Sequence, residues 1–137
     1  MLVRQSVGLT ILALMVFRAS WRWRVPPPPL PHTLSRLEIS LAGLTHISLY
    51  MLLIVMSLAG YLSTAAAGHV VSVFGIVSIP PLSPHHNRWS QVAIAIHLGG
   101  QYRLYLFAAL HVAGALFHGV VRRDGVIERM LPLRGFR

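Results

Sequence analysis

Three histidines share one apolar segment, HLGGQYRLYLFAALHVAGALFH, which covers residues 97–118. His97 and His111 are 14 residues apart, close to four helical turns, and His118 follows 7 residues later, close to two turns. In a helix the three imidazoles therefore lie along one stripe. An imidazole in a bilayer is costly unless it is hydrogen-bonded or bound to a metal, so the stripe is a candidate functional site. A packing role, with the ring bonded to a neighbouring carbonyl or serine, is the alternative.

The spacing of His97 and His111 limits the chemistry that they can carry. At about 1.5 Å per residue, they are roughly 21 Å apart along a helix, too far for one metal ion. This separation fits two haems at different depths in a membrane, each taking one axial imidazole from this helix. Small residues beside the histidines leave room for a flat macrocycle, although they also promote close helix packing. These residues are Gly99, Gly100, Ala108, Ala109, Ala113, Gly114 and Ala115.

The composition excludes several other kinds of chemistry. The chain has no cysteine, so disulfides and thiolate metal sites are ruled out. Its 3 acidic residues give little material for a soluble acid–base enzyme. All 12 basic residues are arginines, and most lie at the ends of apolar runs, which predicts membrane topology and no nucleic-acid binding.

Three long apolar segments predict an all-α integral membrane bundle that forms a single domain over residues 1–137. The expected transmembrane helices cover about residues 2–21, 37–64 and 89–121, each long enough to cross a hydrocarbon core of about 30 Å. A proline-rich loop is expected at 22–36, a second loop against the membrane surface at 65–88, and a tail at 122–137. The four consecutive prolines of WRWRVPPPPLPHTLSR favour an extended linker, with a partner-binding motif as the alternative.

The arginines also predict the orientation in the membrane. One side holds nine of them, at positions 18, 22, 24, 36, 122, 123, 129, 134 and 137. The other side holds Arg4 and Arg88, and Arg103 lies within the third helix. By the positive-inside rule, the proline-rich loop and the C-terminus face the cytoplasm, and loop 65–88 faces outward.

Several motifs in order along the chain resemble those of the bacterial cytochrome b561 family, which is related to Ni-hydrogenase cytochrome b subunits. They are the PPPP linker, LTHISLYMLLIVMSLAGYL, the FG-x4-P loop in VSVFGIVSIPPL, and the H-x13-H-x6-H helix followed by RRDGVIERMLP. The resemblance implies a bundle of four helices in the bacterial inner membrane with two b-type haems. Such a protein passes electrons between quinone and another donor or acceptor, and one branch of the family oxidises superoxide. By this resemblance, His97 and His111 are haem and metal ligands.

Measured against the family, the chain is expected to be shortened at its N-terminus and to lack the first helix, leaving three of four. In the next helix, the usual H-x-S-x-G pattern reads RQSVG, so Arg4 replaces a histidine ligand. A protonated guanidinium cannot ligate iron, although it can pair with a haem propionate. Because His46 and His111 lie at nearly equal predicted depths, the two together are a candidate pair for one haem. Arg103 is expected either to contact a propionate or an anionic quinone, or to extend towards the surface.

These observations favour a membrane electron-transfer protein with one or two b-type haems, in contact with lipid and quinone. If it is an enzyme, the resemblance implies a quinone-linked haem oxidoreductase. A redox partner subunit or a second copy of the chain is a candidate partner. Two alternatives remain open: a haem-deficient anchor or structural subunit of a redox complex, and a small channel in which the histidines and Arg103 form a proton path.

Overall fold

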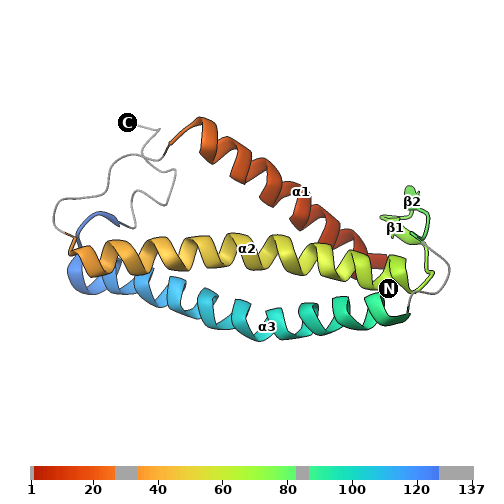
Figure 1. Ribbon diagram of the computed structural model, residues 1–137. Helices are drawn as coiled ribbons and strands as arrows, with labels where there is room; N and C mark the ends of the chain where they lie inside the picture. The colour runs from red at the N-terminus through yellow and green to blue at the C-terminus, as the bar shows by residue number, and fades with distance from the viewer. Residues whose placement is uncertain (1, 27–33, 83–86, 127–137) are drawn as a thin grey trace.

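The computed structural model describes residues 2–26, 34–82 and 87–126, and three long helices dominate it (Figure 1). They are α1 (Leu2–Arg24), α2 (Arg36–Ala66) and α3 (Asn87–Leu116), and α3 continues into a π-helical segment, η1 (Phe117–Arg122). Each is long and apolar enough to cross a membrane. The expected helical membrane bundle is confirmed. Residues 27–33 of the proline-rich loop and most of the C-terminal tail lie outside the described residues.

Helix α1 runs three residues further than the sequence predicted and ends at Arg24. The helical hydrogen bond pattern persists to Val25, whose amide donates to the carbonyl of Trp21 at 2.8 Å. No proline interrupts the segment before Pro26, and the residue that precedes a proline is disfavoured in helical geometry. The end of α1 is therefore set by the first proline.

Helix α2 begins with a capping box. The Ser35 hydroxyl accepts a hydrogen bond from the amide of Glu38 at 3.3 Å, and the Glu38 carboxylate accepts one from the amide of Ser35 at 2.7 Å. Two otherwise unpaired amides are satisfied in this way. The Glu38 carboxylate also pairs with the guanidinium of Arg122 at the end of η1. This ion pair joins the start of α2 to the end of the third span.

The expected loop at 65–88 contains a small antiparallel ribbon, which the sequence analysis did not predict. Strands β1 (Val71–Val73) and β2 (Val77–Ile79) pair with Val71 opposite Ile79. Phe74 and Gly75 form the turn with φ values of 51° and 75°. Val71 is fully buried, and β1 packs against α1. The ribbon therefore closes one end of the bundle.

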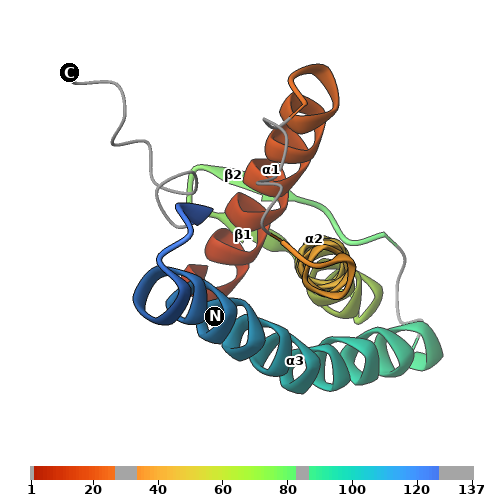
Figure 2. The ribbon, with the colours of Figure 1, turned by 90° about the vertical axis from the view of Figure 1, so that its left-hand side faces the viewer.

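The helices form a bundle that opens towards one end. α2 and α3 lie side by side along their length, whereas α1 meets α2 near the ribbon and diverges from it further along (Figures 1 and 2). We call the end with the ribbon the hairpin end. The opposite end, with Arg24 of α1, Arg36 of α2 and Arg122 of η1, is called the arginine end.

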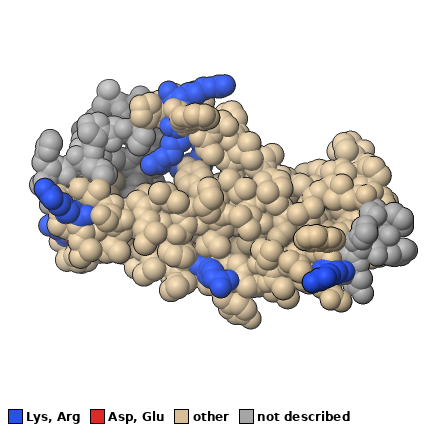
Figure 3. Space-filling model, viewed as in Figure 1, with Lys and Arg blue, Asp and Glu red and all other residues tan. Residues whose placement is uncertain are grey.

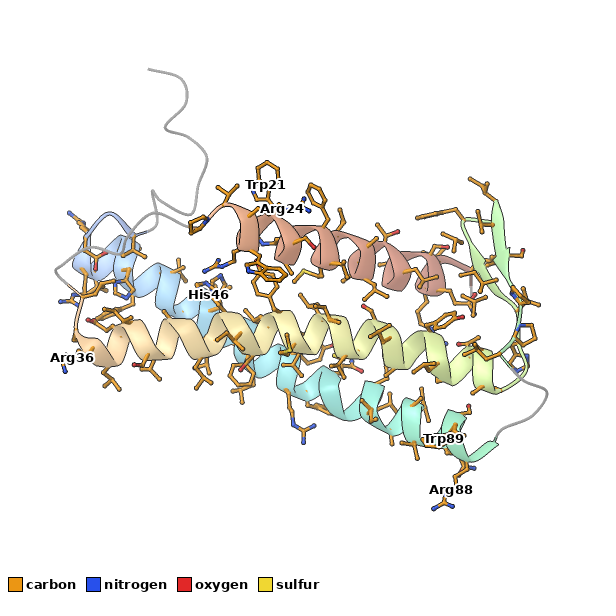
Figure 4. All side chains as sticks on the ribbon, turned by 45° about the horizontal axis from the view of Figure 1, so that its top comes forward. Trp21, Arg24, Arg36, His46, Arg88 and Trp89 are labelled. Carbon is orange, nitrogen blue, oxygen red and sulfur yellow. The ribbon has the colours of Figure 1, made fainter. Side chains whose placement is uncertain are left out.

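The surface of the bundle suits a lipid environment. Large apolar side chains are exposed along all three helices. Figure 3 shows arginines towards both ends and one basic side chain midway along the lower edge, while the rest of the visible described surface carries no charged group. Arg88 and Trp89 lie together at the start of α3, and Trp21 and Arg24 lie near the end of α1 (Figure 4). Such pairs are typical of the headgroup level of a membrane.

Candidate functional site

A cavity with polar groups lies between the three helices near the hairpin end. We call it the His97 chamber. Its volume is about 390 Å³, and most of its lining is apolar. α1 contributes Arg4 and Gly8, α2 contributes Met56 and Gly60, and α3 contributes His97. The structure thus brings together two of the residues that the sequence singled out, Arg4 and His97.

The imidazole of His97 is held in one orientation by the backbone of α2. Its Nδ1 lies 2.8 Å from the carbonyl oxygen of Met56. A carbonyl can only accept a hydrogen bond, so Nδ1 carries the proton and donates it. In the neutral ring Nε2 then keeps its lone pair, and the structure shows no hydrogen bond to Nε2 from the described residues. Histidines that bind metals are commonly oriented in this way.

Two glycines allow the close approach of α2 and α3 at this point. A Cβ atom on Gly60 would lie 3.1 Å from Nδ1 of His97, and a Cβ on Gly100 would lie 2.6 Å from Cγ of Met56. Gly100 is therefore a packing glycine, because the Met56 side chain occupies the space beside it. By contrast, Gly114 has open space around it. Of these small residues, Gly60 is the one that leaves room for the imidazole.

Arg4 is positioned by the start of α1, which the ribbon fixes. Ser6 is fully buried, and its hydroxyl oxygen accepts a hydrogen bond from the amide of Phe74 at 2.7 Å. Its hydroxyl also donates to the carbonyl of Leu2 at 2.9 Å. Gly8, one turn after Arg4, lines the chamber. The three fixed residues of the RQSVG motif thus have distinct places: Arg4 and Gly8 at the chamber and Ser6 under the ribbon.

His46 and His111 meet nearer the arginine end. Their ring centroids are 5.0 Å apart, and the rings are inclined at 63° in an edge contact between α2 and α3. Within the described residues, neither ring has a hydrogen bond to protein. Beside them, the Arg18 Nε donates to the Tyr50 hydroxyl at 2.7 Å and ties α1 to α2 one turn from His46. The rings of His46 and His111, which were predicted to lie at nearly equal depths, are therefore in direct contact.

Two other singled-out residues lie away from the chamber. Arg103 is exposed, and its Nη1 donates to the carbonyl of Gly99 at 3.0 Å on its own helix. His118, in η1, donates from Nδ1 to the carboxylate of Asp124 at 2.7 Å. This hydrogen bond is the main cause of a lowered pKa of Asp124, with a smaller contribution from the amide of Val126.

The sequence analysis missed Met56, Gly60 and Ser6. The acceptor on Met56 is a backbone carbonyl, so its side chain carries no sign of the role. The contacts of Gly60 and Ser6 depend on how helices and ribbon meet. For Ser6 the sequence did contain an indication, because Ser6 is the serine of the family's H-x-S-x-G pattern, which reads RQSVG in this chain. No three His, Cys, Asp or Glu side chains gather in the part of the chain that the structure describes.

Comparison with known proteins agrees with this architecture. The sequence matches the family model of prokaryotic cytochrome b561 over residues 1–133. It is 31% identical to cytochrome b561 homolog 2 of Escherichia coli over 130 residues, which is 94% of this chain and 69% of that protein. It is 28% identical to the probable superoxide oxidase CybB of Yersinia pestis over 131 residues, 96% of this chain and 74% of that protein. Cytochrome b561 homolog 1 of Escherichia coli is 26% identical over 145 residues.

The expected relationship is thereby confirmed, and with it the membership of a family of bacterial multi-pass membrane proteins that bind b-type haem. The match runs through all three helices, the ribbon and the chamber that they enclose. This chain belongs to the prokaryotic cytochrome b561 family.

Proposed function

We propose that this chain holds a b-type haem in the His97 chamber and passes electrons between the quinone pool and another donor or acceptor. The observation that carries the proposal is the state of His97. Its Nδ1 proton is committed to the Met56 carbonyl at 2.8 Å, so Nε2 is the nitrogen available to iron. A bound haem supplies one-electron oxidation and reduction.

The surroundings of His97 fit a haem ligand. The imidazole stands at a chamber of about 390 Å³ whose lining is chiefly apolar, which limits access of water. Gly60 leaves space for the ring, and the hydrogen bond to Met56 prevents it from rotating. Arg4 supplies a positive charge at the same chamber, which suits the negative charge of haem carboxylates.

His111 is proposed as the ligand of a second haem, nearer the arginine end. A haem held between His46 and His111, which their predicted depths suggested, would require the two rings to lie about 1 Å further apart than they do. Metal–imidazole bonds are about 2 Å long, so rings on opposite faces of one iron have centroids about 6 Å apart. The observed centroids are 5.0 Å apart. His46 is therefore proposed to contact and orient His111.

The proposed setting is the bacterial inner membrane, with the arginine end in the cytoplasm. Six of the nine arginines counted for that side are described, and all six lie near the arginine end. A redox partner subunit or a second copy of the chain is a proposed source of further ligands. Lipid covers the apolar faces of the helices.

A test of electron transfer uses the chain purified in detergent with its bound haem oxidised. Under anaerobic conditions, a quinol is added and the visible spectrum is followed, and dithionite then gives the fully reduced reference. The proposal predicts that quinol reduces the haem and that added quinone reoxidises it. A haem that dithionite reduces but that exchanges no electrons with quinol or quinone would contradict the quinone link. A chain that purifies without haem would favour the anchor alternative.

A further inference from the structure

A second cavity is a groove between α2 and α3 near the hairpin end, which we call the α2–α3 groove. Its volume is about 550 Å³, and it is lined by aliphatic side chains and the indole of Trp89. The lining residues come from α2, from α3 and from Leu82 just before α3, and none of them lines the His97 chamber. The groove is therefore separate from the proposed haem site.

The groove has a floor of buried alanines and walls of larger, half-exposed side chains. Ala59 and Ala66 of α2 and Ala93 of α3 are only 5%, 9% and 7% exposed. Leu62 and Ile96, which line the groove beside them, are 42% and 46% exposed. On each helix the lining residues recur three and four positions apart, so they share one face. The result is a slot along the seam between the two helices, open to the surrounding membrane.

The length and depth of the groove match one leaflet of a bilayer. Its lining on α2 runs from Val55 to Ala66, which are 11 positions and about 16 Å apart. Half of a hydrocarbon core of about 30 Å is about 15 Å. On α3 the groove begins at Trp89, which lies beside Arg88 at the headgroup level (Figure 4). A partner helix that spans the membrane would need a face twice as long, whereas an acyl chain needs only one leaflet.

The mouth of the groove carries a positive charge. Arg88 is exposed next to Trp89, and the ion pairs among the described residues do not include it. The two described carboxylates, of Glu38 and Asp124, lie at the opposite end of the bundle. The phosphate of a phospholipid lies at the depth of Arg88 and has the opposite charge. The groove and its mouth are thus complementary to the two parts of one lipid molecule.

We propose that the α2–α3 groove is a specific site for one anionic phospholipid, whose phosphate pairs with Arg88 and one of whose acyl chains lies over the three alanines. This lipid differs from the lipid that covers the helices elsewhere, because charge and shape together hold one molecule at one place. It contacts side chains of both helices, so its binding stabilises the α2–α3 pair. The site does not depend on haem in the His97 chamber.

The test titrates the full chain, purified in detergent and stripped of lipid, with phosphatidylglycerol, and native mass spectrometry counts the lipids bound. The proposal predicts that one molecule binds more tightly than any further ones and raises the melting temperature. Phosphatidylcholine, which has a phosphate but no net charge, should bind more weakly. Phospholipid binding without a distinct first molecule would overturn the proposal. So would a groove that holds an isoprenoid quinone or a second copy of the chain in place of phospholipid.

A matched pair of arginine variants tests the charge at the mouth. Arg88→Gln is expected to weaken binding of the first phosphatidylglycerol about fivefold. Arg36→Gln removes the same charge from an exposed position at the arginine end and should leave that binding unchanged. Equal affinities in the two variants would overturn the role of Arg88.

A second pair tests the shape of the groove. Ala93→Leu fills the floor and should abolish binding of the first lipid, whereas Ala109→Leu, at an exposed position of the same helix outside the groove, should not. Circular dichroism checks that both variants keep their helix content. Val92→Phe narrows the groove from its half-exposed wall and gives the same test if Ala93→Leu does not fold. Undiminished binding in a folded variant with a filled groove would overturn the proposal.

Discussion

At the scale of single residues, the histidines of the described spans differ in what each ring nitrogen meets. His97 donates to a backbone carbonyl, His118 donates to a carboxylate, and His46 and His111 contact each other. All four are histidines, and the partner of each ring determines which ring nitrogen remains able to bind another group. The proposed haem ligand is therefore His97, whose ring is held through Nδ1 and whose Nε2 has no hydrogen bond to the described residues.

The hydrogen bond from His118 to Asp124 gives a pH dependence that can be measured. It lowers the pKa of the Asp124 carboxyl below its ordinary value of 3.8. A lowered carboxyl pKa stabilises the fold above the unfolded-state value, and this contribution is lost as the pH falls through the folded-state value. Asp124→Asn should therefore reduce the melting temperature at neutral pH, and the difference from the parent chain should shrink below about pH 4.

Thermal unfolding of the detergent-solubilised chain, followed by circular dichroism over a series of pH values, checks this expectation. His118→Leu removes the same hydrogen bond, so in that background Asp124→Asn should change the melting temperature less, and by an amount that depends less on pH. A difference in melting temperature between the parent chain and Asp124→Asn that stays constant down to the lowest pH would contradict the proposed cause.

At the scale of elements, the contact between α2 and α3 positions the chamber. Met56 of α2 is in contact with Gly100 of α3, and one turn away the Met56 carbonyl meets His97. The same residue of α2 therefore sets both the spacing of the helices and the orientation of the imidazole. Small residues allow such close approach of membrane helices, where van der Waals packing drives association.

Gly100→Val tests this contact. Its Cβ would lie 2.6 Å from Cγ of Met56, so either the Met56 side chain or the helices must shift, at a cost of about 1–3 kcal/mol. Haem content and thermal stability in detergent should both fall. For thermal stability, Gly114→Val on the same helix is the control, because a Cβ there meets no atom within 4 Å. Equal losses in the two variants would show that the valine acts on the helix itself and not on the contact.

The helices were predictable from the sequence, and the ribbon was not. Runs of about 20 apolar residues bounded by arginine or proline predict a membrane-spanning helix. By contrast, β1 and β2 have 3 residues each, and glycine and proline flank them. Such short strands depend on tertiary contacts, here the burial of Val71 and the hydrogen bond from Phe74 to Ser6. The local sequence does not contain that information.

At the scale of the whole molecule, the distribution of charge predicts the orientation. Arginines concentrate at the arginine end, and few lie at the hairpin end (Figure 3). A fluorescent protein fused after Arg137 should therefore fluoresce in cells, and alkaline phosphatase fused at the same place should be inactive. A phosphatase inserted in the turn at Gly75 should be active. The reverse pattern of activities would contradict the proposed orientation.

The site was predictable in part. The sequence singled out Arg4 and His97, and the structure places both at one chamber. It also predicted equal depth for His46 and His111, whose rings touch. Helical periodicity gives depth and facing, which explains both results. The Met56 carbonyl, the space at Gly60 and the distance between two rings depend on how helices pack, so they required the structure.

The central claim is that His97 holds haem, and the ratio of haem to protein in His97→Ala tests it most directly. Parent chain and variant are purified in the same detergent, and haem is quantified together with the reduced-minus-oxidised spectrum. The account predicts that the variant loses the haem of the chamber and keeps any haem bound at His111, while circular dichroism shows the same helix content. An unchanged haem ratio and an unchanged spectrum in a folded His97→Ala variant would contradict it.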